Sequence, residues 1–358
     1  MTQPARIRSV PIGPVTLGPG RPVRIQSMVS VSPSRLQESI HQLKACEQAG
    51  AEIMRVSVRD QADTRAIAEL KRHTPMPIVA DIHYNYKLAL AAADHGADKL
   101  RINPGNLGGK DNLQRVCDKA MAKGIPIRVG VNAGSLEREL KTHGRVTPEQ
   151  MVESAARNVR ILEERGFFNI VVSLKANDVT RTVASNRLFR ESFPYPLHIG
   201  VTEAGPAVPG MIKSAMAFYD LLRDGIGETL RVSLSAPPVE EIVAGWEIVK
   251  AMGLRRRGLE VVSCPTCGRK NFDVIAVSTE LQQTLRFLHQ PVSVAVMGCP
   301  VNGLDEARHV DVGVCGIAPG KARIFFCGRE QEDVQEAEIM DVLVRYIKKA
   351  AQQRGASP

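Results

Sequence analysis

The feature that most constrains this chain is a repeat of short apolar, β-branched runs, each followed by a segment whose apolar residues have helical spacing. Eight such runs occupy residues 23–28, 52–58, 77–82, 99–103, 126–132, 169–175, 197–202 and 230–234. Eight strand–helix units over about 250 residues are typical of a (β/α)8 barrel. A doubly wound sheet would carry a glycine-rich phosphate motif after its first strand, and none follows Met28. The sequence therefore predicts an α/β protein with a TIM barrel.

Two helix starts can be read directly. Ser32 followed by Pro33 is expected to cap a helix with proline at its first position. Thr147 and Gln150 flank a proline in a predicted capping box, in which Gln150 reaches back to the cap.

The repeat ends near residue 253, at a basic, glycine-flanked segment that we interpret as a linker. We therefore expect a barrel domain over residues 1–252 and a small α+β domain over residues 259–358. In the second domain, strands are predicted at 260–263, 292–297, 310–314 and 323–326, with one helix through Leu281 and Leu285 and a last helix through Leu343.

Composition narrows the possible partners. Lys and Arg number 47 against 38 Asp and Glu, which gives a formal charge of +9 and favours an anionic partner. The basic residues are dispersed and aromatics make up only 4%, so nucleic acid is not expected. No apolar run approaches the roughly 18 residues of a membrane helix, and no apolar stretch follows the first arginines as in a secretory signal. We expect a cytoplasmic protein without membrane contact.

Basic residues recur inside the predicted barrel strands. Arg55, Arg101, Arg128 and Arg231 each lie between apolar residues, and Lys175 ends the sixth strand. Buried arginine normally needs a partner, and an ion pair with Asp81 or Glu203 would explain a single case. Five cations on one ring of strands are harder to pair internally. Because barrel active sites lie at the carboxyl ends of the strands, the pattern favours a phosphate or diphosphate ligand.

Other polar residues end these strands, namely Asp81, His83, Asn103, Asn132, Thr202, Glu203 and Ser233. Glu203 is a candidate acid or base, and a salt bridge to a neighbouring arginine explains its position equally well.

Cysteines concentrate near the end of the chain, where five of the seven occur. Cys264 and Cys267 form a Cys-x-x-Cys motif, and Cys299 follows within Gly-Cys-Pro-Val-Asn-Gly. A thioredoxin-like motif needs no third cysteine, whereas a zinc site and an iron–sulfur cluster each take four ligands. Cys315 or Cys327 could supply a fourth ligand, and spacing alone leaves zinc and iron–sulfur open.

Several long motifs resemble one family, the 4-hydroxy-3-methylbut-2-enyl diphosphate synthases of the non-mevalonate isoprenoid pathway, in their bacterial two-domain form. They are Val79-Ala-Asp-Ile-His83, Leu100-Arg-Ile-Asn-Pro-Gly-Asn106, Ile127-Arg-Val-Gly-Val-Asn-Ala-Gly-Ser-Leu136, Thr202-Glu-Ala-Gly205, Gly225-Ile-Gly-Glu-Thr-Leu-Arg-Val-Ser-Leu234, Ser263-Cys-Pro-Thr-Cys-Gly-Arg269 and Gly298-Cys-Pro-Val-Asn-Gly303. They follow the family order over nearly the whole chain.

The resemblance implies an iron–sulfur oxidoreductase that reductively opens and dehydrates 2-C-methyl-D-erythritol 2,4-cyclodiphosphate. It implies a [4Fe-4S] cluster held by Cys264, Cys267, Cys299 and Glu306, with electrons from flavodoxin or ferredoxin, in a homodimer whose cluster domains close the partner barrels. By motif position, the implied substrate-binding residues are Arg55, Arg101, Arg128, Asn132, Lys175, Thr202, Arg231, Ser233 and Asn302, with Glu203 handling protons.

The chain departs from the family pattern at residues 29–32, at Pro237 and at residues 304–305. The implied ligands and cations are all present.

Two rival readings are a barrel enzyme of another class, such as a pterin-dependent transferase, and a non-enzymatic protein with a structural zinc domain. Neither accounts for both the cations and the cysteine triad.

Overall fold

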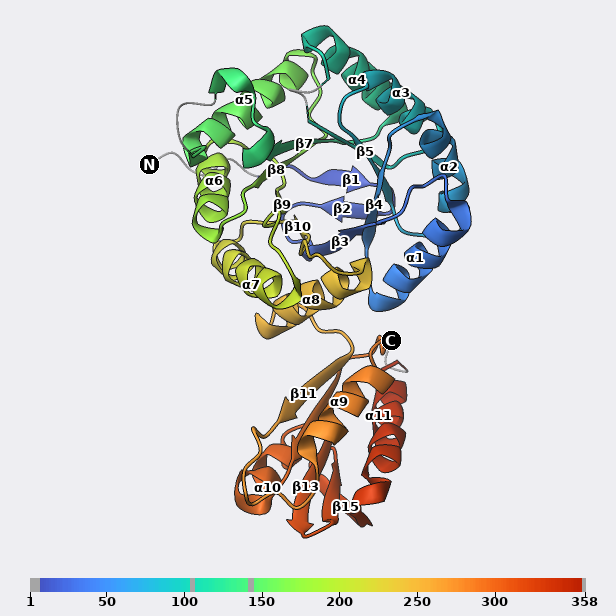
Figure 1. Ribbon diagram of the computed structural model, residues 1–358, viewed down its shortest axis with the longest axis vertical. Helices are drawn as coiled ribbons and strands as arrows, with labels where there is room; N and C mark the ends of the chain where they lie inside the picture. Colours follow the sequence, from blue (N-terminus) through green and yellow to red (C-terminus); the bar gives the residue numbers. More distant parts are fainter. Residues whose placement is uncertain (1–6, 104–106, 141–144, 356–358) are drawn as a thin grey trace. The chain divides into compact units, whose positions relative to one another are not determined.

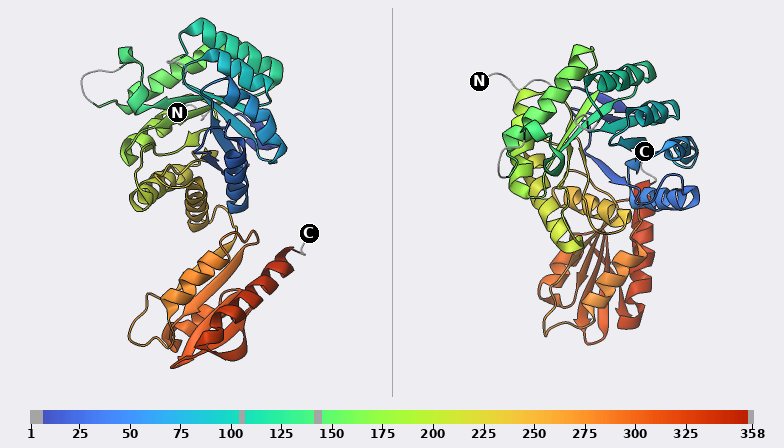
Figure 2. Two further views of the ribbon diagram at one scale, coloured as in Figure 1. Left: turned by 45° about the vertical axis from the view of Figure 1, so that its right-hand side comes forward. Right: turned by 45° about the horizontal axis from the view of Figure 1, so that its top comes forward.

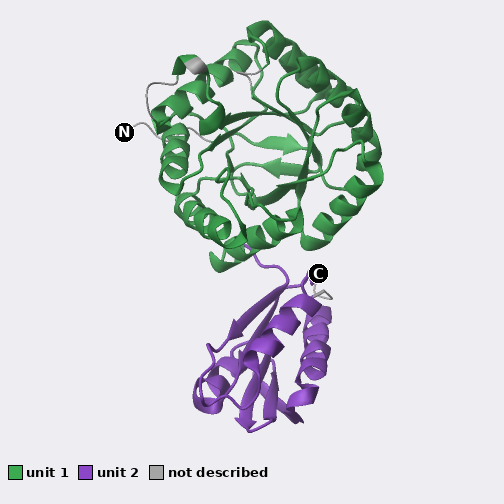
Figure 3. Cartoon of the chain, in the orientation of Figure 1, with its two compact units in different colours: residues 1–254 green, residues 255–358 purple. Residues whose placement is uncertain are grey.

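The computed structural model describes residues 7–103, 107–140 and 145–355. The chain divides into two compact units, Met1–Leu254 and Arg255–Pro358, which are coloured separately in Figure 3 and are described one at a time here. Asn106, the last residue of one family-like motif, lies outside the described residues.

The first unit is a parallel barrel surrounded by helices, as predicted (Figure 1). Its strands are β3 (Arg24–Met28), β4 (Ile53–Ser57), β5 (Ile78–Ile82), β6 (Lys99–Ile102), β7 (Ile127–Asn132), β8 (Ile170–Lys175), β9 (His198–Ile199) and β10 (Thr229–Leu230). They are ordered β8-β7-β6-β5-β4-β3-β10-β9. A parallel bridge between Val172 of β8 and Leu197 closes the ring.

Helices cover the outside of this ring (Figure 2). They are α1 (Leu36–Ala49), α2 (Gln61–Arg72), α3 (Tyr86–Asp94), α4 (Lys110–Lys123), α5 (Pro148–Glu164), α6 (Val179–Ser192), α7 (Ala207–Arg223) and α8 (Pro238–Ala251). Alternate strand residues such as Met54, Val56 and Leu100 pack in the large core shared with these helices. Because side chains alternate across a strand, the residues between them point into the barrel.

One of the two predicted helix starts is confirmed. Thr147 and Gln150 form the capping box of α5. The cap at Ser32 was wrong, because α1 begins at Leu36 after Arg35. The Ser32 hydroxyl instead donates to Asp63 at 2.6 Å and so joins the loop to α2.

A hairpin that the sequence reading did not predict lines the amino-terminal end of the barrel. Strands β1 (Val10–Ile12) and β2 (Val15–Leu17) pair antiparallel. Their side chains pack with Ile53, Val79 and Val171, which lie at or next to the first residues of β4, β5 and β8. This apolar layer leaves the carboxyl ends of the strands for a site.

The second unit is a five-stranded sheet with three helices. The strand order is β11 (Leu259–Ser263), β12 (Val292–Met297), β13 (Val312–Ala318), β14 (Lys321–Phe326) and β15 (Arg329–Gln335), and the helices are α9 (Val274–Thr284), α10 (Pro300–Arg308) and α11 (Ile339–Gly355). Sequence analysis missed β15 because it is an edge strand whose side chains are nearly all exposed and polar. It also missed α10, a nine-residue helix within the cysteine motif. Throughout the described chain, no helix is long and apolar enough to cross a membrane.

Candidate active site

The barrel interior carries the predicted cations instead of the branched apolar residues that usually fill a TIM barrel. Arg55, Arg101, Arg128 and Lys175 are all buried, and Arg128 is only 1% exposed. Register pairing places Arg101 beside Arg128, and Asn132 beside Lys175. The strands therefore bring four of the five predicted cations to the inner face as buried side chains.

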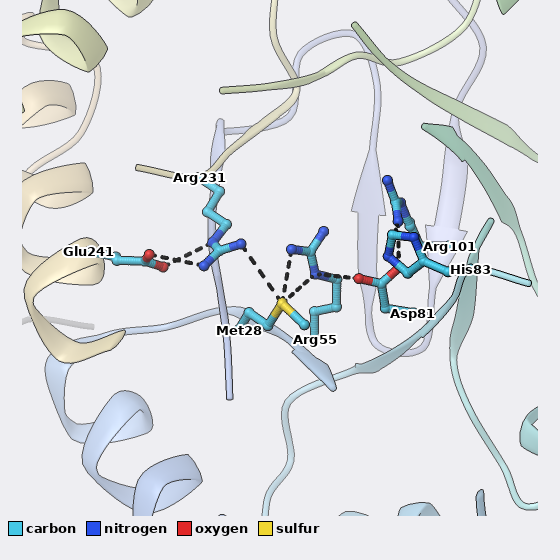
Figure 4. A network of polar contacts seen from close by, with 7 residues as sticks. All are labelled: Met28, Arg55, Asp81, His83, Arg101, Arg231 and Glu241. Carbon is cyan, nitrogen blue, oxygen red and sulfur yellow. Dashed lines mark hydrogen bonds and ion pairs between the residues drawn. The ribbon is translucent and has the colours of Figure 1, made fainter. Parts of the chain in front are cut away.

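Two of these arginines share one carboxylate, as Figure 4 shows. Asp81 Oδ1 accepts a hydrogen bond from Arg101 Nη1 at 2.8 Å, and Asp81 Oδ2 lies 3.5 Å from Arg55 Nε. Burial alone would raise the pKa of Asp81, but the charge of Arg55, a hydrogen bond to His83 and the charge of Arg101 together hold this pKa well below its usual value. Asp81 is therefore an anion throughout the neutral range, and the ion pair considered from sequence exists.

The fifth cation has a different partner, which sequence analysis did not identify. Arg231 forms a two-pronged ion pair with Glu241, at 2.9 Å for both Nε and Nη2. Glu241 also accepts a hydrogen bond from the Ser27 hydroxyl at 2.6 Å. Glu241 lies in the first turn of α8, so no strand pattern could indicate that it reaches the barrel.

A methionine sulfur links the two ion pairs (Figure 4). Arg55 Nε and Nη2 lie 3.1 and 2.9 Å from Met28 Sδ, and Arg231 Nη1 lies 3.8 Å from the same atom. A thioether is a weak acceptor, so these guanidinium groups keep donor capacity for a stronger acceptor.

Arg128 and Lys175 have no acidic partner within the described residues. Nε and Nη1 of Arg128 make no hydrogen bond. Burial, followed by neighbouring arginines, lowers the pKa of both side chains well below the usual values. At the level of this network, the five predicted cations thus face two carboxylates, those of Asp81 and Glu241. This surplus attracts an anion and disfavours a neutral ligand.

Two glycines make room for these side chains. A Cβ on Gly130 would lie 2.8 Å from Arg101 Nε, and one on Gly200 would lie 2.5 Å from Lys175 Nζ. Any larger residue would therefore displace a cation from the inner face.

The remaining predicted barrel residues lie at strand ends. Asn132, Thr202 and Ser233 are half-buried. Glu203 is exposed and has a φ of 52°, a left-handed conformation that is uncommon for glutamate and is often found at functional sites. No ion pair to Glu203 occurs among the residues described, so the structure gives no support to the salt-bridge explanation.

A pocket of about 310 Å³ opens beside the network. Its walls include Met28, Ser57, Arg59, Arg231 and Glu241, together with residues 29–32. The loop in which the sequence departs from the family pattern therefore borders the cationic site.

In the second unit, the predicted cysteines follow the carboxyl ends of neighbouring parallel strands. Cys264 follows β11, and Cys299 follows β12 as the residue before α10. The backbone N–H of Gly298 donates to Cys264 Sγ at 3.3 Å. Cys267 is exposed, while Asn302 and Glu306 are exposed on α10.

These residues suit an iron–sulfur group by their chemistry. All three thiols are free and at least partly accessible, and an N–H aimed at a cysteine sulfur is a contact that tunes such clusters. Across residues 7–103, 107–140 and 145–355, however, no three His, Cys, Asp or Glu side chains are grouped closely enough to hold a metal ion. The structure brings Cys264 and Cys299 to one end of the sheet without assembling the full predicted set.

Comparison with known proteins gives a consistent result. The GcpE TIM-barrel domain model matches residues 7–246, and the GcpE protein C-terminal domain model matches residues 260–349. A relative from Geobacter sulfurreducens is 46% identical and covers 96% of this chain and 98% of its own. One from Caldanaerobacter subterraneus is 44% identical, with 96% of each chain covered. Both are named 4-hydroxy-3-methylbut-2-en-1-yl diphosphate synthase (flavodoxin).

Solved structures with a similar fold are dihydropteroate synthases. One from Stenotrophomonas maltophilia has a TM-score of 0.51 at 18% identity and covers 68% of this chain and 97% of its own. One from Yersinia pestis has a TM-score of 0.52 at 12% identity, with 69% and 100% covered. At this identity the likeness concerns the barrel fold alone.

Proposed function

Because the chain belongs to the GcpE family of 4-hydroxy-3-methylbut-2-enyl diphosphate synthases, we propose that its barrel cations bind the cyclic diphosphate substrate of that reaction. The protein is an oxidoreductase of isoprenoid biosynthesis. The reaction is the two-electron reductive ring opening and dehydration of 2-C-methyl-D-erythritol 2,4-cyclodiphosphate to 4-hydroxy-3-methylbut-2-enyl diphosphate.

The surplus of buried cations carries this proposal. Among the residues described, Arg128 and Lys175 lack acidic partners, and Arg55 contacts a weak acceptor besides its shared carboxylate. Guanidinium groups bind phosphate oxygens in two-pronged geometry, so a bound diphosphate supplies the missing acceptors. Arg55, Arg101, Arg128, Lys175 and Arg231 are the proposed diphosphate ligands.

Polar groups at the strand ends complete the proposed substrate site. Asn132, Thr202 and Ser233 have the side chains to hydrogen-bond the sugar-derived part and the phosphate oxygens. Glu203 is exposed and forms no ion pair within the described part of the chain, and we assign it proton transfer or electrostatic stabilisation during loss of the hydroxyl group.

In the second unit, Cys264, Cys267, Cys299 and Glu306 are the proposed ligands of a [4Fe-4S] cluster. Cys264, Cys267 and Cys299 would hold the cluster through thiolates and Glu306 through a carboxylate, which is the weaker ligand for thiophilic iron, and the bound group would supply the two electrons one at a time. Asn302, three residues after Cys299 on α10, is the proposed contact with substrate from this unit.

Flavodoxin is the proposed electron donor, as in the names of the relatives, with ferredoxin as the alternative.

We also propose a homodimer in which each cluster unit serves the partner's barrel. Helix α8 runs back from the carboxyl ends of the strands, and only about ten residues, which span at most some 35 Å, lead on to Cys264. Mixing Arg128→Met chains with Cys299→Ser chains tests this arrangement. Activity should partly return in mixed dimers, and no recovery in confirmed mixed dimers would contradict it.

The central test of substrate binding is Arg128→Met in the anaerobically reconstituted enzyme. Loss of a charge-assisted contact should weaken substrate affinity by roughly 1.5–3 kcal/mol, which corresponds to about 10- to 150-fold. Thermal stability should rise or stay constant because an unpaired buried cation is removed. Arg157→Met, on the exposed face of α5, is the control and should bind as the wild type does. Equal affinity in the two variants would show that Arg128 does not bind the diphosphate.

A further inference from the structure

A second layer of polar side chains lies deeper in the barrel, beneath the proposed ligands. It consists of Gln26, Lys99, His198 and Thr229, which we call the inner floor. Each precedes by two residues a site position that lies on the same strand or immediately after it, so that both side chains share the inward face. The residues above them are Met28, Arg101, Gly200 and Arg231.

The inner floor is fully enclosed and unpaired. Lys99, His198 and Thr229 are 0% exposed, and Gln26 is 1% exposed. Lys99 Nζ, both ring nitrogens of His198, both amide atoms of Gln26 and the Thr229 hydroxyl have no hydrogen-bond partner in the described structure. Burying such groups costs free energy, and apolar residues would fill the space of a purely structural layer more favourably. A functional role deep in the barrel therefore explains these polar side chains better than a purely structural role.

Lys99 faces mostly cations. Among the described residues, the charged and titratable groups around the interior are Arg55 of β4, Asp81 of β5, His83 just after β5, Arg101 of β6, Arg128 of β7, Lys175 of β8, His198 of β9, Arg231 just after β10 and Glu241 of α8. Strand β3 contributes the uncharged Gln26 and Met28. Asp81 and Glu241, the two carboxylates, already pair with Arg55, Arg101 and Arg231.

Within residues 7–103, 107–140 and 145–355, no carboxylate is therefore left to pair with Lys99. Burial, followed by the charges of Arg128 and Arg55, lowers the pKa of Lys99 well below its usual value. The same burial lowers the pKa of His198, with Lys175 and Arg128 adding to it. A diphosphate bound above would reverse the local potential and favour a charged amine.

We propose that Lys99 is a positioning residue that is neutral in the ligand-free barrel and takes up a proton when the diphosphate binds. Lys99 does not contact the ligand and acts through Arg128. A positive charge on Lys99, below the Arg128 guanidinium, strengthens the electrostatic field that holds the anion. This inference rests on the proposed function of the barrel. Each phosphorus of a cyclic diphosphate carries one ester bond, one anhydride bond and a single acidic oxygen that is ionised near neutral pH, so a proton taken up on binding goes to the protein.

Isothermal titration calorimetry of the full-length protein tests this directly. The cyclodiphosphate is titrated at one pH into two non-phosphate buffers with different ionisation enthalpies, which gives the number of protons taken up. The wild type should take up protons, and its affinity should fall as the pH rises. Lys99→Met should lose roughly one proton per site and bind about tenfold more weakly. Lys87→Met, an exposed residue of α3 with the same charge change, should match the wild type.

The outcomes separate this inference from the function it rests on. If the wild type does not bind the cyclodiphosphate, the proposed function fails. Binding by the wild type without proton uptake overturns the role of Lys99 and leaves the function standing. Unchanged uptake in a folded Lys99→Met also overturns it, since a merely structural lysine would not alter the proton count. Lys99→Gln, which keeps a polar group, provides the same comparison if the methionine variant does not fold.

Discussion

Removing the shared carboxylate of Asp81 should destabilise the ligand-free barrel strongly. In Asp81→Asn, Arg55 and Arg101 stay buried and lose the one anion that they share. Breaking a buried pair by removing one partner costs about 3–5 kcal/mol, because the remaining charge is left uncompensated. For a unit of this size, that loss in the free energy of unfolding lowers the Tm by roughly 6–20 °C.

Differential scanning calorimetry of the barrel transition measures this loss. Asp94→Asn is a matched control, since Asp94 also pairs with two cations, Lys119 and Lys123, but at the surface. Exposed pairs contribute about 0–1 kcal/mol, so the control should barely change the Tm. If the two variants melt alike, the buried arginines are not stabilised by Asp81 and the charge argument is wrong.

Acid titration provides a second arm of the same experiment. The pKa of Asp81 is held below its usual value, so its contribution is complete above the unfolded-state pKa of about 3.9. The contribution is lost as the pH falls below that value toward the folded-state pKa. The stability difference between the wild type and Asp81→Asn should therefore be constant near neutral pH and shrink only below about pH 4. A difference that shrinks already between pH 5 and 7 would contradict this assignment.

Three further outcomes follow from the site. Glu203→Gln should bind substrate normally while kcat falls by about 10²–10⁴-fold, and wild-type turnover would reject proton transfer by this residue. Gly130→Ala should weaken substrate affinity because its methyl group would lie 2.8 Å from Arg101 Nε, and the same substitution added to Arg101→Met should have no further effect; additive losses would show independent causes. Anaerobic wild-type protein should contain about four irons per chain. Cys299→Ser should lose iron, whereas the control Cys327→Ser, at an exposed cysteine, should keep it. Stoichiometric zinc without iron would refute the cluster.

Strand periodicity predicted much of the site because a strand fixes which side chains share a face. The inward placement of Arg55, Arg101 and Arg128 follows from the apolar residues on either side of each. Glu241 could not be predicted in the same way, because its role depends on how α8 packs against β3 and brings the Glu241 carboxylate to Ser27 and Arg231. Glu203, the partner considered from sequence, is exposed instead.

In the second unit, local sequence was less informative. The strands next to Cys264 and Cys299 were predicted, while the helix that carries Asn302 and Glu306 was not. A helix of only nine residues that contains glycine has weak intrinsic stability, so its packing against β12 and β13 stabilises it. The polar edge strand β15 likewise has no periodic apolar pattern to read.

The closure of the barrel has a consequence for how the chain folds during synthesis. Strand β3 pairs with β10, so that Arg24 meets Thr229 and Ile25 meets Leu230. At about 5–20 residues per second, the ribosome needs roughly 10–40 s to make the chain between these partners. During that interval one edge of β3 has no neighbour, and an open strand edge invites pairing with other nascent chains. We expect ribosome-bound chains that end before β10 to be digested readily by protease and to recruit chaperones, and longer chains to become resistant once the ring closes.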